Sequence, residues 1–214
     1  ASDVYKRQPF ATALTLAGLT AGHPVVLVMP EDAPALRQET LLRLGAQIRH
    51  SPARSGLAGA RALAAQTAAA NGWYYMNWLA NDDNPEYHRR VTGPAIVQSI
   101  ARQNKSLVDA ITIGVGSAGT VTGVGETIKA WTNDVRIVAV EPYENQVLGG
   151  GLTGPHGIPD IGYGIVPENY NSYVVDNVSA VASRDAQRAA QQQIQHFSNC
   201  QTSQYKSHCN NDGK

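Results

Sequence analysis

The sequence has little that would direct it to a membrane, to nucleic acid or to an oxidising compartment. Its 214 residues carry 17 basic and 17 acidic side chains, so no excess positive charge is present to bind a nucleic-acid backbone. No apolar run approaches the roughly 20 residues that span a bilayer, and no apolar signal-peptide core is seen. The two cysteines, Cys200 and Cys209, form no disulfide framework and lack the partner ligands of a zinc site. We expect a cytoplasmic protein that binds no membrane, no nucleic acid and no metal.

Both ends of the chain differ from the rest in composition. Residues 1–8 have no hydrophobic period and resemble the translation of a sequencing adapter, so we interpret them as an assembly scar and leave them out of the fold; a disordered native terminus is the alternative. Residues 197–214 contain no Ala, Val, Ile, Leu or Met and cannot bury a core face. We expect an aberrant or disordered tail there.

Between these ends, apolar runs alternate with helix-forming segments. This alternation predicts an α/β fold with parallel sheets and helices on both faces. We expect a small α/β domain over 9–82 and part of a larger domain over 83–196. Strands are predicted at 25–29, 46–50, 73–76, 108–113, 135–140, 174–175 and 178–181, and helices at 9–21, 33–44, 57–70, 87–102, 119–131 and 183–196.

The most informative stretch is residues 111–123, where an apolar run ends in a loop of small residues and a helix-forming segment follows. Small residues let backbone N–H groups approach an anion closely, and a helix N-terminus adds a favourable dipole. The stretch therefore predicts a phosphate-binding loop. The spacing Gly114-x-Gly116-x-x-Gly119 also fits a dinucleotide fingerprint, with Glu141 as the carboxylate that would bind a ribose.

Two further motifs flank this loop. The first, over 81–94, contains Asn84-Pro85, His88 and Thr92-Gly93-Pro94; a plain loop and helix cap would explain it equally well. The second, over 154–167, is dense in glycine, which lets a backbone approach a flat ligand. Its isoleucines argue against the alternative of a fully exposed loop.

In this order and with this spacing, the three motifs resemble the cysteine synthase and cystathionine β-synthase family, the tryptophan-synthase-β-like (fold type II) pyridoxal-phosphate enzymes. The resemblance covers about residues 10–190 and implies a two-domain fold, of which this chain would be an internal fragment truncated at both ends. It implies pyridoxal 5′-phosphate as cofactor, a small amino-acid substrate and a homodimer when complete. It assigns the cofactor phosphate to Gly116, Ser117, Ala118, Gly119 and Thr120, and the cleft beside cofactor and substrate to Ile161, Gly162 and Tyr163.

The chain departs from the family pattern at several positions. The lysine of the SxKDR-like motif, which would bind the cofactor covalently, and the SGNTG loop are not in this sequence, so no catalytic residue is assigned. Ala118 and Asp160 stand where the family has glycine, and Trp78 stands where a substrate-binding glutamine is usual.

Three interpretations of function remain open from the sequence. The first is a fragment of a β-replacement enzyme that makes cysteine from O-acetylserine and sulfide, inactive by itself without the lysine. The second is a nucleotide-dependent oxidoreductase that uses the same glycine loop. The third is a non-catalytic relative that acts as a binding partner.

Overall fold

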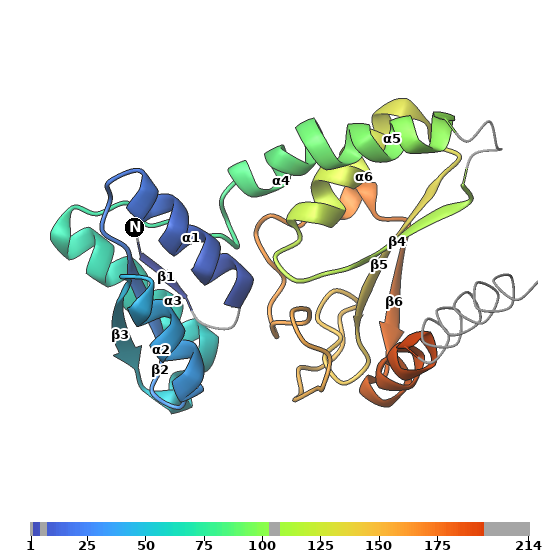
Figure 1. The fold of residues 1–214 in the computed structure, drawn as a ribbon. Coiled ribbons are helices and arrows are strands. Elements are labelled where there is room, and N and C mark those ends of the chain that lie inside the picture. Colours follow the sequence, from blue (N-terminus) through green and yellow to red (C-terminus); the bar gives the residue numbers. More distant parts are fainter. Residues whose placement is uncertain (1, 5–7, 103–107, 195–214) are drawn as a thin grey trace, which may run out of the picture.

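The computed structural model of the chain describes residues 2–4, 8–102 and 108–194. In this part of the chain, two sheets of three parallel strands each are accompanied by helices (Figure 1). Parallel neighbours need a crossover connection. Helices supply it between the other paired strands, whereas an irregular segment over 143–176 with one 3-10 turn precedes the last strand. The predicted α/β class with parallel sheets is confirmed; the division into domains at residue 82 stays a prediction.

The first sheet has the order β1-β2-β3. Its strands are β1 (Ser2–Val4), β2 (Val26–Pro30) and β3 (Gln47–Ser51). The helices of this part are α1 (Gln8–Thr20), α2 (Ala35–Arg43), the 3-10 turn η1 (Ala53–Ser55) and α3 (Gly56–Asn71). Strand β1 is not predicted from the sequence, because residues 1–8 have no hydrophobic period and were expected to lie outside the fold.

The central strand β2 is buried on both of its faces. Leu27 packs in one core cluster with Leu14 of α1 and Leu41 of α2, whereas Val28 packs in another with the alanines of α3. Side chains alternate along a strand, so these contacts place α1 and α2 on one face and α3 on the other. Full burial of one such leucine stabilises the fold by about 2 kcal/mol.

The second sheet has the order β4-β5-β6. It is formed by β4 (Ala110–Gly114), β5 (Arg136–Pro142) and β6 (Asn177–Val181). The other elements are α4 (Asp83–Tyr87), the π-helical turn η2 (His88–Thr92), α5 (Gly93–Arg102), α6 (Gly119–Trp131), the 3-10 turn η3 (Ser172–Val174) and a helix that begins at Ser183. Val121, Val124 and Ile128 of α6 pack against Ile137 and Ala139 of β5.

Two predicted strands are wrong. Residues 73–76 contain only an isolated bridge at Tyr75, and the backbone turns at Asn77, which has a positive φ of 41°. Val174 ends a 3-10 turn instead of starting a strand, because the side chain of Asn171 accepts a hydrogen bond from the Tyr173 N–H and holds the turn. The helix predicted from residue 87 begins four residues earlier, at Asp83.

The segment α4–η2–α5 lies across α6, and the two approach each other at a glycine. A Cβ on Gly123 would lie 2.2 Å from the Pro85 carbonyl oxygen and 2.6 Å from Cβ of His88. No side chain fits at such distances, so only glycine permits this spacing of the two helical segments. Within the described ranges, no helix combines the length and apolar character needed to cross a membrane.

We predict that Gly123→Ala lowers the free energy of unfolding by about 1–3 kcal/mol, because the added methyl group overlaps backbone atoms of α4 and η2. The gain in helix propensity from Ala is only about 1 kcal/mol and opposes this loss. Urea unfolding followed by circular dichroism measures the change. Ala130→Ser, at an exposed position of the same helix, is the control and should change stability by less than about 0.5 kcal/mol. Equal stability of Gly123→Ala and wild type would contradict the close contact.

Candidate functional site

The glycine loop over 115–120 connects the end of β4 to the first residues of α6. Val115 anchors it to the neighbouring strand, since its N–H donates to the Val140 carbonyl at 2.9 Å. Ala118, directly before α6, has a left-handed backbone with φ of 65°. Asp160 has the same φ, so both residues that replace a family glycine occupy conformations that favour glycine. A left-handed backbone at a residue other than glycine costs about 1 kcal/mol of folding free energy.

The loop presents a row of backbone donors. The first N–H of α6 with a backbone acceptor is that of Thr122, which donates to the Ala118 carbonyl at 3.0 Å. In the described part of the chain, the N–H groups of residues 116–121 have no hydrogen-bond acceptor, although Gly116, Ala118 and Gly119 are buried. Buried donors need an acceptor, and here they coincide with the positive end of a helix dipole. The loop is therefore suited to an anion with several oxygens, such as a phosphate.

Two asparagines outside the loop donate hydrogen bonds to Ser117 of the loop. Asn84 Nδ2 donates to the Ser117 Oγ and to the Trp78 carbonyl, both at 3.0 Å. Asn169 Nδ2 donates to the same Trp78 carbonyl at 2.8 Å and to the Ser117 carbonyl at 3.3 Å. A Cβ on Gly119 would lie 1.9 Å from Asn84 Oδ1, so Gly119 makes room for this asparagine. The motif over 81–94 predicts no role for Asn84, and no local pattern in the sequence indicates Asn169.

His88 contacts the other end of the loop. Its Nε2 lies 3.1 Å from Thr120 Oγ1, and its Nδ1 lies 2.9 Å from Thr92 Oγ1. Partial burial lowers the pKa of the His88 imidazole below its ordinary value of 6.5, because the charged form is poorly solvated there. The motif over 81–94 is thus more than a loop and cap, since its Asn84 and His88, four residues apart, both contact the glycine loop.

The second predicted segment, Ile161-Gly162-Tyr163, lies beside the same loop. The Gly162 N–H donates to the Val115 carbonyl at 3.1 Å. The Gly162 carbonyl accepts from Asn145 Nδ2 at 3.1 Å and from His156 Nε2 at 2.8 Å. These bonds fix the segment at the end of β4, so the structure brings together the two groups of residues that the sequence predicts as one site.

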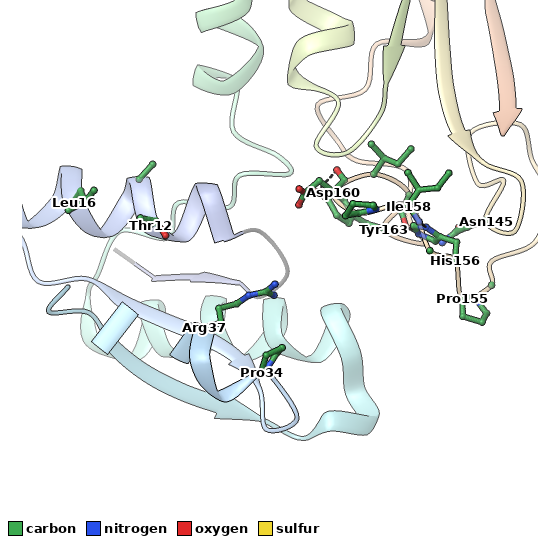
Figure 2. A pocket seen from close by; sticks show the side chains of 16 residues that line it. Thr12, Leu16, Pro34, Arg37, Asn145, Pro155, His156, Ile158, Asp160 and Tyr163 are labelled. Atoms are coloured by element: carbon green, nitrogen blue, oxygen red, sulfur yellow. Dashed lines mark hydrogen bonds between the residues drawn. The ribbon is translucent and has the colours of Figure 1, made fainter. Parts of the chain in front are cut away.

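A cleft of about 960 Å³ opens in front of this segment (Figure 2). Thr12 and Leu16 of α1 and Arg37 of α2 line one side, and the loop over 154–163 lines the other, with the Arg37 side chain extending toward that loop. Tyr163 packs edge-on against Trp78, at 5.3 Å between ring centroids. Trp78 also contacts Phe10 of α1 at 5.8 Å, so aromatic contacts connect the two sides. In the described residues, no group of three or more His, Cys, Asp or Glu side chains could hold a metal ion.

Glu141 has a structural position. It is only 2% exposed, and its two carboxylate oxygens accept the N–H groups of Leu148 and Gly149 at 2.8 and 3.0 Å. Both oxygens are thus engaged by the backbone, which disfavours the ribose contact of a dinucleotide site. Lys129 also has a structural place, because its Nζ donates to Asp176 and to the Val135 carbonyl. Lys6, Lys105 and both cysteines lie outside the described residues.

We predict that stability depends on pH through His88. The folded-state pKa is lowered, so the unfolded chain binds the proton more readily once the pH falls to about 6.5. The free energy of unfolding should therefore fall as the pH drops through this value. Urea unfolding of wild type and His88→Gln from about pH 8 to about pH 5 isolates the contribution, which the variant should lack. The same pH slope in both proteins would show that His88 makes no such contribution.

Comparisons with known proteins identify the family of this chain. The family described as pyridoxal-phosphate dependent enzyme matches residues 10–198. A cysteine synthase of Staphylococcus aureus is 32% identical over 165 residues, which cover 77% of this chain and 52% of the relative. The chain thus spans about half the length of the curated relatives it matches.

Several solved structures are similar to this chain in both fold and sequence. A cysteine synthase (OASS) of Entamoeba histolytica is 30% identical with a TM-score of 0.77, covering 86% of this chain and 54% of that one. A hydrogen sulfide-producing enzyme of Fusobacterium nucleatum is 27% identical with a TM-score of 0.79, covering 85% and 55%. An O-ureido-L-serine synthase is 27% identical with a TM-score of 0.78, covering 85% and 57%. The chain belongs to the pyridoxal-phosphate dependent enzyme family, in the cysteine synthase group of fold type II.

Proposed function

We propose that the glycine loop of this chain binds the phosphate of pyridoxal 5′-phosphate in an enzyme that replaces a β-substituent of an activated serine. The observation that carries the proposal is the row of N–H donors over 116–121, which have no acceptor in the described part of the chain and lie at the start of α6. A phosphate dianion supplies several oxygens to such donors. The Ser117 and Thr120 hydroxyls add two further donors.

The residues around the loop fit the rest of the cofactor. Ile161, Gly162 and Tyr163 are held beside the loop by the hydrogen bond from Gly162 to Val115, and we assign to them the cleft that receives ring and substrate. When bound, the cofactor withdraws electrons from the α-carbon of an amino acid, which lets a group on the β-carbon leave. The protein itself binds the phosphate and orients the ring, and the packed rings of Trp78 and Tyr163 exclude water from the cofactor.

The reaction proposed for the complete enzyme is cysteine synthesis from O-acetylserine and sulfide. The cysteine synthases similar to this chain support this reaction. Trp78, which stands where the family has a substrate-binding glutamine, is buried and packs against Tyr163, a residue that lines the cleft. We further propose that the complete enzyme is a homodimer.

The oxidoreductase interpretation has no support from the structure. A dinucleotide site needs a free carboxylate at Glu141, and both of its oxygens are bonded to backbone N–H groups. The matched family is described by its dependence on pyridoxal phosphate.

We predict that the chain binds pyridoxine 5′-phosphate more tightly than pyridoxine. Both probes lack the aldehyde, so no lysine can react with them and only the phosphate differs. Removal of two hydroxyl donors in Ser117→Ala/Thr120→Val should weaken binding of the phosphorylated probe at least about tenfold, because hydrogen bonds to charged groups contribute about 1.5–3 kcal/mol each. Isothermal titration calorimetry measures the affinities.

The control for this experiment is Ser99→Ala, at an exposed position of α5, which should bind like wild type. Equal affinity for the two probes would contradict the phosphate assignment. Binding of NADH in preference to pyridoxine 5′-phosphate would instead favour the oxidoreductase.

We also predict that the 214-residue chain forms no cysteine from O-acetylserine and sulfide in the presence of pyridoxal 5′-phosphate. The sequence holds neither the lysine motif that would activate the cofactor nor the SGNTG loop that would bind the substrate carboxylate. A colorimetric assay for cysteine tests this. Formation of cysteine above the rate without protein would contradict the expected inactivity while leaving the family unchanged.

A further inference from the structure

The two hydroxyl groups of the glycine loop each have one partner on the segment α4–η2. Asn84 contacts the Ser117 Oγ, and His88 contacts the Thr120 Oγ1. The partners differ chemically. An asparagine Nδ2 can only donate, so Ser117 accepts from Asn84 and keeps its own hydroxyl proton for another acceptor. A neutral imidazole nitrogen can donate or accept, so the direction of the bond to Thr120 depends on which nitrogen of His88 carries the proton.

A second histidine shows how a tautomer becomes fixed. His156 Nε2 faces the Gly162 carbonyl, which only accepts, and its Nδ1 faces the Ile158 N–H, which only donates. The His156 proton therefore lies on Nε2. His88 instead faces a hydroxyl on each side, Thr92 at Nδ1 and Thr120 at Nε2. A hydroxyl can both donate and accept, so both tautomers of His88 satisfy these two contacts.

We propose that His88 is a positioning residue that turns the Thr120 hydroxyl proton toward the bound phosphate. In this arrangement the Thr92 hydroxyl donates to Nδ1, the Nε2–H donates to Thr120 Oγ1, and the Thr120 O–H donates to the anion. This inference rests on the proposed binding of phosphate at the glycine loop. It adds Thr92 and His88, which do not touch the phosphate, to the residues that determine its affinity.

The opposite tautomer would work against phosphate binding. With the proton on Nδ1, the Thr120 hydroxyl would donate to Nε2 and would turn a lone pair toward a dianion. Burial, which lowers the pKa of His88, favours the neutral ring on which such a choice of tautomer depends. The helical spacing is essential as well, because residues four apart lie on one face, and this spacing relates Asn84 to His88 and His88 to Thr92.

Titration calorimetry with pyridoxine 5′-phosphate tests the relay through variants of His88 and Thr92. In His88→Gln the side-chain amide can place a donor where Nε2 lies, so affinity should stay within about twofold of wild type. In His88→Asn the amide is too short to reach Thr120, and in Thr92→Val the donor to Nδ1 is lost. The variants His88→Asn and Thr92→Val should each bind pyridoxine 5′-phosphate about fivefold to tenfold more weakly than wild type, because one oriented hydrogen-bond donor is lost. Thr40→Val, which removes an exposed threonine hydroxyl of α2 far from the loop, should bind like wild type.

A double-mutant cycle separates the relay from a general loss of structure. In the Thr120→Val background there is no hydroxyl to orient, so His88→Asn should cause no further loss of affinity. Long-range ¹⁵N–¹H correlation spectra of the wild-type protein with pyridoxine 5′-phosphate should show the proton of His88 on Nε2. A bound state with the proton on Nδ1, or a His88→Asn variant with wild-type affinity, would overturn the relay.

The outcomes also distinguish the relay from the function on which it rests. If wild type prefers pyridoxine 5′-phosphate to pyridoxine while His88→Asn does the same with equal strength, the phosphate site stands and the relay is overturned. If wild type shows no such preference, the proposed phosphate site is itself overturned, and the relay with it.

Discussion

The geometry of the site depends on how closely the segment α4–η2 approaches the first turns of α6. Gly119 and Gly123 make this approach possible, because a Cβ at either position would overlap Asn84, or Pro85 and His88. Close packing in turn places the side chains of Asn84 and His88 within hydrogen-bond distance of the Ser117 and Thr120 hydroxyls. The glycines of this region thus act by removing side chains from a helix contact, in addition to any freedom they give the loop.

Hydrogen bonds also connect separate parts of the chain near the end of β4. Val115 bonds to β5 and accepts from Gly162, and Trp78 accepts from Asn84 and Asn169. The polar groups of the site are largely engaged by one another, whereas the N–H donors of the glycine loop are not engaged by the described residues. A preorganised set of donors of this kind binds an anion with little further ordering. Membership of the pyridoxal-phosphate dependent family agrees with an anion of this type.

Sequence patterns predicted the parts of this structure that follow local rules. Apolar runs marked β2 and β3 of the first sheet and all three strands of the second, and the small residues before α6 marked the loop. The patterns failed where a tertiary contact decides. Residues 73–76 have the composition of a strand, yet the chain turns at Asn77, and Ser2–Val4 pairs with β2 although its own sequence shows no period. The roles of His88 and Asn169 depend on residues 32 and 52 positions away, which no local pattern reveals.

The proposed function depends on the N–H groups over 116–121 binding the phosphate of the cofactor. A crystal structure of the chain with pyridoxine 5′-phosphate tests it most directly, since the position of the phosphorus atom is measured without turnover or a reactive lysine. We expect phosphate oxygens within about 3 Å of the loop nitrogens and of the Ser117 and Thr120 hydroxyls. A phosphate bound elsewhere on the chain, with the loop nitrogens facing only water, would contradict it.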